Sequence, residues 1–310
     1  MKADSVRTIL YALGANLAIA AAKTAAAIFT GSSAMLAEAI HSYADSGNQG
    51  LLLWGMRQAK RPPSPDYPLG WGKAVFFWSF IVALVLFSLG GIFSLYEGWH
   101  KLQHPEPIDS WRWVPIVVLL LAIGLESYSF RTAIHESNEV RGTLGWTQFV
   151  RRAKAPELPV VLLEDFAALI GLVLALLGVG LTLITDDGTW DGLGTIAIGL
   201  LLVCVAVVLA IETKSLLLGE AATPDAVRRI EDALVADPSV RRVIHMKTLH
   251  LGPEELLVAA KIAVAPTDSA ADVAAAIDAA EARVREAEPI ARVIYLEPDI
   301  DRGQSTPATP

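Results

Sequence analysis

The chain has 310 residues, of which 53% are hydrophobic and 19% are charged, and its formal net charge at neutral pH is −8. So large an apolar share exceeds what the core of a soluble domain holds, which indicates a membrane protein. The acidic balance excludes a nucleic-acid-binding protein, which needs a basic surface. The single cysteine, Cys204, excludes a disulfide framework and a paired-cysteine metal site within this chain.

Six apolar stretches follow one another along the chain, and each is long enough to cross about 30 Å of hydrocarbon as a helix. The predicted spans cover residues 9–29, 33–54, 75–95, 114–130 with an amphipathic extension to 135, 158–184 and 193–210. The first stretch lacks a polar exit with a cleavage site, so we interpret it as a retained helix. Charged residues become dense after Ala210, which sets the predicted membrane domain at residues 1–212.

Basic residues mark one side of the predicted spans. They precede the first span and follow the second and the fourth: Lys2, Arg7, Arg57, Lys60, Arg61, Lys73, Arg141, Arg151, Arg152 and Lys154. The last connection on the opposite side, from Asp186 to Asp191, has no base. Because Lys and Arg favour the cytoplasmic side, the sequence predicts a multi-pass integral protein of the inner or plasma membrane with cytoplasmic N- and C-termini.

A pattern of short helices and strands begins at Thr223. We expect helices at 225–236 and 269–286 and strands at 240–249, 256–265 and 291–296. This order predicts a small α+β domain at residues 222–300, followed by a disordered tail at 303–310. The apolar strand residues Val258, Ile262 and Val264 need cover, and so small a domain gains stability from dimerisation.

The second predicted span carries ionisable side chains on one helix face. Glu38, His41 and Asp45 are spaced by three and four residues, so they share a face, and His41 and Asp45 can reach the same ion. An ionisable group at bilayer depth costs about 3 kcal/mol, so each requires a compensating role. For His41 and Asp45 alone, hydrogen bonding between helices explains the pair as well as a metal does.

The fifth predicted span adds a second acidic position, the adjacent pair Glu164 and Asp165. Adjacent residues point about 100° apart around a helix, so at most one of the two faces the second span directly. Two acidic helices indicate a shared cation rather than structural hydrogen bonding alone. Imidazole with carboxylates is a ligand set that zinc accepts, whereas calcium prefers more oxygen ligands and no imidazole.

Other polar side chains in the spans serve packing, gating or charge compensation. We expect Lys23 to neutralise an internal acid. We expect Glu126 to be a solvated carboxylate near the cytoplasmic end of its span, paired with Arg131. The candidates for gating or proton coupling are Glu38, Asn16, Asn48 and Lys23.

Three segments of the sequence resemble the cation diffusion facilitator family. The run from Ser32 to Gln49, with its H-x-x-x-D core at His41 and Asp45, is similar to the family's second helix. The segment from Tyr67 to Lys73 resembles the family's cytoplasmic loop, and the segment from Ser215 to Ala221 resembles its exit from the sixth helix. The resemblance implies a six-helix, all-α transmembrane domain and a small cytoplasmic α+β domain of ferredoxin-like fold, through which the family dimerises.

The resemblance also implies a divalent-cation efflux transporter of the zinc type, which exchanges metal for protons by alternating access between the second and fifth helices. It assigns the ligands as His41, Asp45, Asp165 and Glu164. The family's usual second H/D-x-x-x-D is absent, because Val161 stands four residues before Asp165. The Glu164-Asp165 pair instead resembles the branch of mitochondrial or nuclear zinc transporter-like members. Asp165 aligns with the family's helix-five aspartate and is therefore expected to matter more than Glu164.

The expected partners are a second copy of the chain, the lipid bilayer, divalent cations and protons, with zinc as the transported substrate and no organic cofactor. Manganese, iron and cobalt stay open, because the same ligands accept them. Two other functions also stay open: a membrane metal sensor or scaffold without transport, and a metallohydrolase with Glu164 as its base. The chain shows no other catalytic motif, so we expect that it is not an enzyme. We expect His245 and Glu297 of the tail to hold no metal that transport needs.

Overall fold

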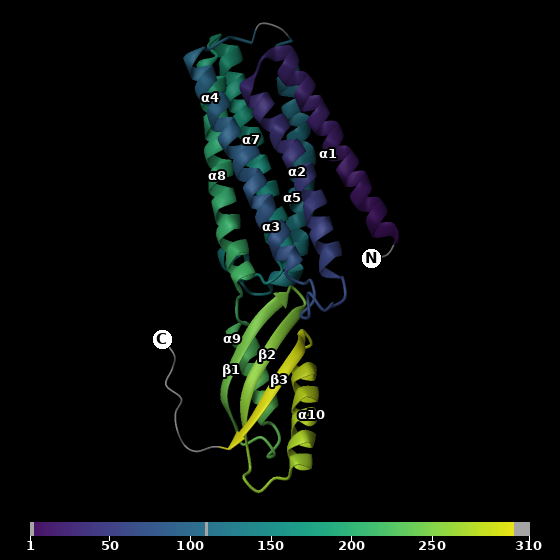
Figure 1. Ribbon diagram of the computed structural model, residues 1–310. Coiled ribbons are helices and arrows are strands. Elements are labelled where there is room, and N and C mark those ends of the chain that lie inside the picture. The colour runs from purple at the N-terminus through teal and green to yellow at the C-terminus, as the bar shows by residue number, and fades with distance from the viewer. Residues whose placement is uncertain (1–2, 109–110, 301–310) are drawn as a thin grey trace. The chain divides into compact units, whose positions relative to one another are not determined.

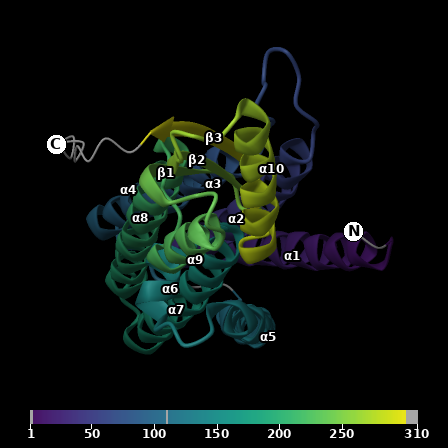
Figure 2. The ribbon, with the colours of Figure 1, turned by 90° about the horizontal axis from the view of Figure 1, so that it is seen from below.

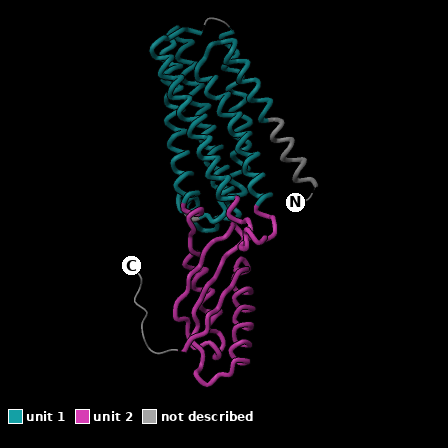
Figure 3. Tube along the Cα trace, in the orientation of Figure 1, with its two compact units in different colours: residues 1–58, 75–214 teal, residues 59–74, 215–310 magenta. Residues whose placement is uncertain are grey.

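The structure, a computed structural model, describes residues 3–108 and 111–300, with side chains described from Asn16 onward except that of Arg152. The chain divides into two compact units, residues 1–58 with 75–214 and residues 59–74 with 215–310 (Figure 3). The loop 59–74 thus groups with the second unit rather than with the helices that flank it. The predicted tail 303–310, Lys2 and the side chain of Arg7 lie outside the described residues.

Long helices form the first unit, where they run side by side in a bundle (Figure 1). They are α1 (Ala3–Thr30), α2 (Ser33–Ala59), α3 (Ala74–Val85), the π-helical segment η1 (Leu86–Ile92), α4 (Phe93–Gln103), α5 (Val114–Arg141), the short α6 (Trp146–Arg152), α7 (Glu157–Thr185) and α8 (Thr189–Leu218). Four helices in the described part of the chain are long and apolar enough to cross a membrane: α3 to α4 taken as one, α5, α7 and α8. α2 is not among them, and it is the helix with the polar face of the second predicted span.

The helices extend beyond the predicted spans. α5 continues to Arg141, whereas its prediction ended at residue 135, and the α3–α4 helix reaches Gln103 rather than residue 95. α8 covers Thr189–Leu218 instead of residues 193–210. These corrections share one cause. Apolar composition marks only the part of a helix that meets hydrocarbon, whereas the helix itself continues through polar residues until a breaker ends it.

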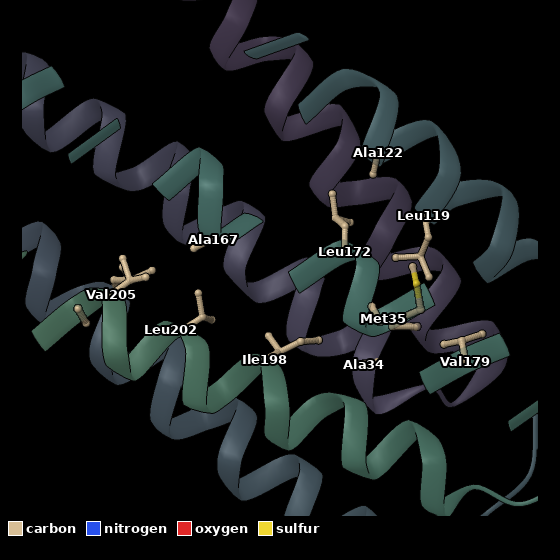
Figure 4. Packing of buried hydrophobic residues seen from close by; sticks show 14 of the residues in the cluster. Ala34, Met35, Leu119, Ala122, Ala167, Leu172, Val179, Ile198, Leu202 and Val205 are labelled. Atoms are coloured by element: carbon tan, nitrogen blue, oxygen red, sulfur yellow. The ribbon is translucent and has the colours of Figure 1, made fainter. Parts of the chain in front are cut away.

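Apolar side chains and small residues pack the middle of the bundle. Met35 of α2, Leu172 of α7 and Ile198 of α8 are fully buried members of one cluster (Figure 4). The backbones of α4 and α8 lie unusually close, because a Cβ atom on Gly98 would lie 2.9 Å from the carbonyl oxygen of Gly192. Small residues at helix contacts permit this kind of close packing in membrane proteins.

Asp191 stands in the first turn of α8 rather than in the predicted link, and its side chain is buried. Its carboxylate accepts hydrogen bonds from the backbone N of Ser33 at 2.7 Å, from the backbone N of Ala34 at 3.3 Å and from the hydroxyl of Ser32 at 2.7 Å. The first N–H groups of a helix have no partner within that helix. Asp191 therefore caps α2 from a helix far away in the sequence and ties the two together.

The second unit contains α9 (Pro224–Val235), β1 (Arg242–Gly252), β2 (Glu255–Val264), α10 (Ala270–Ala287) and β3 (Ala291–Ile300), which confirms the predicted order. The sheet has the strand order β1-β2-β3, with β1 antiparallel and β3 parallel to β2. Both helices pack on the same face of this sheet (Figure 2). The result is the small α+β domain that the sequence predicted.

The helix-covered face holds the core of the second unit. Val258 and Ile262 of β2 are fully buried there and share a cluster with Ile230 of α9 and Val284 of α10. The expectation that Val258, Ile262 and Val264 need cover from a second copy is therefore wrong. The two helices of the same chain cover Val258 and Ile262, and Val264 is also buried within the chain.

The opposite face of the sheet carries polar and aromatic side chains around a cavity of about 410 Å³. Tyr295 is 61% exposed on it. Lys261 lies between His245 and Glu297 in the strand register and forms ion pairs with Glu297 at 2.9 Å and Asp299 at 3.4 Å. The hydrogen bond to Glu297 raises the pKa of Lys261. His245 and Glu297, which the sequence analysis considered as metal ligands, thus lie on either side of the Lys261 ammonium group.

We expect Asp191→Ala to lower the free energy of unfolding of the helical unit by about 2 kcal/mol, because it leaves the buried N–H groups at the start of α2 without an acceptor. Thermal unfolding of the purified chain in detergent measures the change. Asp186→Asn is the control, since Asp186 is exposed, its ion pair with Arg112 contributes little, and asparagine tolerates the left-handed backbone at this position. Equal melting temperatures for Asp191→Ala and wild type would contradict this role of the carboxylate.

Candidate functional site

One face of α2 carries four polar side chains, Glu38, His41, Asp45 and Asn48. All but Asp45 are buried, and the side chain of Asp45 is 18% exposed. The Nε2 atom of His41 lies 3.4 Å from Oδ2 of Asp45, as the one-turn spacing of the two residues predicts. The structure therefore confirms that these residues share a face of the second long helix.

Glu164 and Asp165, the acidic pair of α7, contact two different neighbouring helices. Glu164 is buried, and its Oε1 accepts a hydrogen bond of 2.8 Å from the amide Nδ2 of Asn48 on α2. Asp165 accepts a hydrogen bond of 2.8 Å from the hydroxyl of Ser129 on α5. The roughly 100° between adjacent helical residues produces this divergence. Glu164 thus faces α2 and Asp165 faces α5.

A buried ion pair joins α1 to α2 directly beside these residues. The Nζ atom of Lys23 lies 3.1 Å from Oε2 of Glu38 and donates a hydrogen bond of 2.8 Å to the hydroxyl of Ser42. The other oxygen of Glu38 rests against α7, where a Cβ atom on Gly171 would lie 2.7 Å from it. The expectation that Lys23 neutralises an internal acid is confirmed, and a glycine on α7 makes room for that acid.

Glu126 of α5 was missed as a site residue by the sequence analysis. It lines a cavity of about 10 Å³, the room of one water-sized sphere, together with Asn16, Ser42 and Asp45. The interpretation of Glu126 as a solvated partner of Arg131 is therefore wrong. No spacing rule on α5 could have found this contact, because it depends on which face of α5 packs against α1 and α2.

The site gathers negative charge and unpaired polar atoms. Asp45 lines the same small cavity as Glu126, and Glu164 is bonded to Asn48, which lies three residues further along α2. Five buried side-chain atoms of the site residues lack a hydrogen-bond partner in the described part of the chain: both ring nitrogens of His41, Asp45 Oδ1, Asn48 Oδ1 and Glu38 Oε1. Buried polar atoms of this kind are the groups that a cation or a water can engage. Within residues 16–108 and 111–300, no three His, Cys, Asp or Glu side chains meet as a preformed metal cluster.

Apolar helices with an imidazole, an ammonium group and several carboxylates buried among them are typical of a polytopic membrane protein whose interior polar groups serve a function. Residues 9–218 match the family model described as the cation efflux transmembrane domain. The chain belongs to the cation efflux family, which confirms the resemblance to cation diffusion facilitators.

Curated relatives of the chain are transporters, not enzymes. The mitochondrial proton-coupled zinc antiporter SLC30A9 of Xenopus laevis is 35% identical over 243 residues, which are 77% of this chain and 43% of that protein. The same antiporter of Homo sapiens is 35% identical over 227 residues, 73% of this chain and 40% of that protein. The zinc transporter ZitB of Escherichia coli is 24% identical over 125 residues, 40% of each chain. The chain thus spans about two fifths of the length of these SLC30A9 proteins.

We expect Lys23→Met to lower the free energy of unfolding by about 3–5 kcal/mol, because it leaves the carboxylate of Glu38 buried without its counter-charge. The double variant Lys23→Met with Glu38→Gln should recover most of that loss, because it removes both charges together. Melting temperatures of the two single variants and the double variant in detergent complete the cycle. Thr24→Ala, the next position on α1, serves as the control. Additive losses in the double variant would show that the pair does not interact.

Proposed function

We propose that this protein moves divalent metal cations, zinc first, out of the cytoplasm in exchange for protons. The observation that supports it most is the pair His41 and Asp45, 3.4 Å apart on α2 and inside a domain of the cation efflux family. An imidazole and a carboxylate at bilayer depth are costly unless they serve a function. A transported cation supplies that function.

The proposed ligands come from two helices. α2 contributes His41 and Asp45, and α7 contributes Asp165 and Glu164. The Asn48 amide already links Glu164 to α2 at 2.8 Å, whereas Asp165 bonds to Ser129 of α5 at 2.8 Å. A shift of α7 along α2 gathers these carboxylates around the substrate ion, and the reverse shift releases it. Such a pair of discrete packings is what alternating access requires.

Proton coupling follows from the chemistry of the same ligands. Zinc binds neutral imidazole and ionised carboxylates, so protons arriving from the far side compete with the metal for these groups and expel it. The residues that adjust the local charge or gate the path are Glu38, Asn16, Asn48 and Lys23. Glu126 joins them, because it lines the same small cavity as Asp45 and Asn16.

The choice of zinc rests on ligand type. Imidazole with carboxylates suits zinc, and the SLC30A9 and ZitB relatives carry zinc in their names. Manganese, iron and cobalt are the competing substrates, because selectivity among them depends on site geometry. A sensor or scaffold that binds metal without transport is the second candidate function. The side chain of Asp165 favours it, because its hydrogen bond to Ser129 turns it toward α5 rather than α2.

The proposed function includes a membrane topology and a homodimer. Six spans, α1, α2, α3 to α4, α5, α7 and α8, cross the membrane, and both chain ends lie in the cytoplasm. The second unit pairs two copies into a homodimer through the open face of its sheet, where Tyr295 is 61% exposed. Aromatic residues of this kind are enriched in protein interfaces.

We expect Asp45→Ala to reduce metal transport to the background of protein-free vesicles, and His41→Ala to lower it or change the preferred metal. Removing a ligand leaves the ion under-coordinated at bilayer depth. Metal flux into proteoliposomes under a pH gradient, normalised to folded protein and repeated for zinc, manganese, iron and cobalt, measures both effects. Metal binding with no flux in the wild type would support the sensor, and full flux in Asp45→Ala would refute the assigned site.

The acidic pair of α7 provides a matched comparison within the same assay. Glu164→Gln can keep the hydrogen bond from Asn48 through its amide oxygen, so we expect a moderate loss. Asp165→Asn can likewise keep the hydrogen bond from Ser129, but it removes the carboxylate that aligns with the family's helix-five aspartate, so we expect a larger loss. An inactive Glu164→Gln beside an active Asp165→Asn would reverse the two roles.

We expect the fragment of residues 222–300 to fold alone, because its core cluster comes from its own helices and strands. We also expect it to dimerise, and Tyr295→Arg to shift it toward the monomer by placing a charge on the open face. Sedimentation at several concentrations measures the association. Arg228→Ala on α9 is the control, since it lies outside this face. A folded fragment that stays monomeric at high concentration would remove the proposed interface.

A further inference from the structure

A cavity of about 650 Å³ lies among α5, α6, α7 and α8 of the helical unit, away from the polar face of α2. Its lining is almost entirely apolar and includes Phe130 of α5, Trp146 and Val150 of α6, Phe166 of α7 and Val208 of α8. Pockets of roughly 300–1,000 Å³ with apolar walls and a few polar groups are typical ligand sites. The proposed transport function does not use this cavity.

The short helix α6 builds one wall of the cavity. Phe149 on α6 is buried and packs against Ala133 of α5 and Leu162 of α7, which anchors the helix to the bundle. Trp146 lies three residues before Phe149, and Val150 lies one residue after it. Both side chains line the cavity. The guanidinium of Arg141 stacks over the ring of Trp146 at 4.4 Å and fixes the side chain at the wall.

The polar groups of the cavity gather at one end. Arg151 of α6 and Glu212 of α8 line it there, with the Nε of Arg151 3.8 Å from a carboxylate oxygen of Glu212. Arg141 and Lys154 add positive charge nearby in the chain. The other end, at Phe130, Phe166 and Val208, is apolar. The carboxylate of Glu212 balances Arg151, and the guanidinium of Arg141 over Trp146 leaves an excess of positive charge at this wall. A molecule that fits this arrangement has an apolar chain and an anionic head.

We propose that the cavity binds an anionic phospholipid, with an acyl chain between α5, α7 and α8 and the phosphate against Arg151. In a membrane-embedded unit the bilayer is the abundant source of such amphiphiles. Basic residues gather at this end of the spans, which is the mark of the cytoplasmic side. Anionic lipids concentrate in that leaflet and attract membrane-proximal Arg and Lys. The charge of Arg151 therefore matches the lipid available at its depth.

The bound chain reaches the neighbours of the candidate ion site. Phe130 and Phe166 line the cavity, and their rings lie 5.9 Å apart between α5 and α7. Ser129 and Asp165, which join the same two helices by a hydrogen bond, immediately precede them in the sequence. An acyl chain in the cavity therefore packs against the aromatic pair next to Asp165 and supports the spacing of α5 and α7.

Trp146 gives a direct optical test of the lipid, independent of transport. The full chain is reconstituted in phosphatidylcholine vesicles that contain a small, equal fraction of either brominated phosphatidylglycerol or brominated phosphatidylcholine. The contribution of Trp146 is the fluorescence quenching of the wild type minus the fluorescence quenching of Trp146→Phe. We expect phosphatidylglycerol to occupy the site with a roughly fivefold preference over phosphatidylcholine, and its brominated form therefore to quench Trp146 more strongly. This preference is the equivalent of the ~1 kcal/mol that one basic residue contributes.

Variants separate the cavity from general surface charge. Arg151→Gln should abolish the preference, Arg151→Lys should keep it, and Leu163→Phe, which fills the cavity, should reduce quenching by both lipids. Arg112→Gln is the matched control, because Arg112 is also in an exposed ion pair but precedes α5 at its other end. Equal quenching by the two lipids in the wild type, or loss of the preference in Arg112→Gln, would overturn the proposal.

Discussion

A charged group buried among apolar helices is stable only when another polar group compensates it, and α2 carries several such groups. The ammonium of Lys23 compensates Glu38 at 3.1 Å, and the hydroxyl of Ser42 takes a further hydrogen bond from the same ammonium. Because Gly171 has no side chain, α7 can lie against the remaining oxygen of Glu38. This compensation leaves His41 and Asp45, one turn further along α2, to interact with each other. They are the residues that we propose as ligands of the transported cation.

Polar contacts divide the helices around the site into two linked groups. Lys23 joins α1 to α2, and Asp191 joins α8 to the start of α2. Asp165 and Ser129 join α7 to α5, and the aromatic pair of these helices adds an apolar contact one residue along. Two hydrogen bonds connect these groups: Asn48 of α2 donates to Glu164 of α7, and the backbone N of Asp191 on α8 donates to the hydroxyl of Thr182 on α7.

Much of the fold could be predicted because its signals are local. Apolar runs of bilayer length located α5, α7 and α8, and period-two and period-3.6 patterns gave the helix and strand order of the second unit. The shared face of Glu38, His41 and Asp45 followed from helix geometry alone. Helix ends did not follow in the same way. α5 runs on to Arg141 because hydrocarbon length does not limit a helix that continues into water.

The partners of the polar side chains were decided only by the tertiary structure. Sequence spacing fixed that Glu164 and Asp165 point apart, but only the packing of α7 against α2 and α5 decided which residue met Asn48 and which met Ser129. The same holds for Glu126, which lies beside Asp45, and for Asp191, which caps a helix far from it in the sequence. The sequence by itself determined a membrane bundle with a costly polar face on α2, because burial and periodicity are properties of one segment. Compensation of those charges joins different segments, so it exists only once the helices have packed.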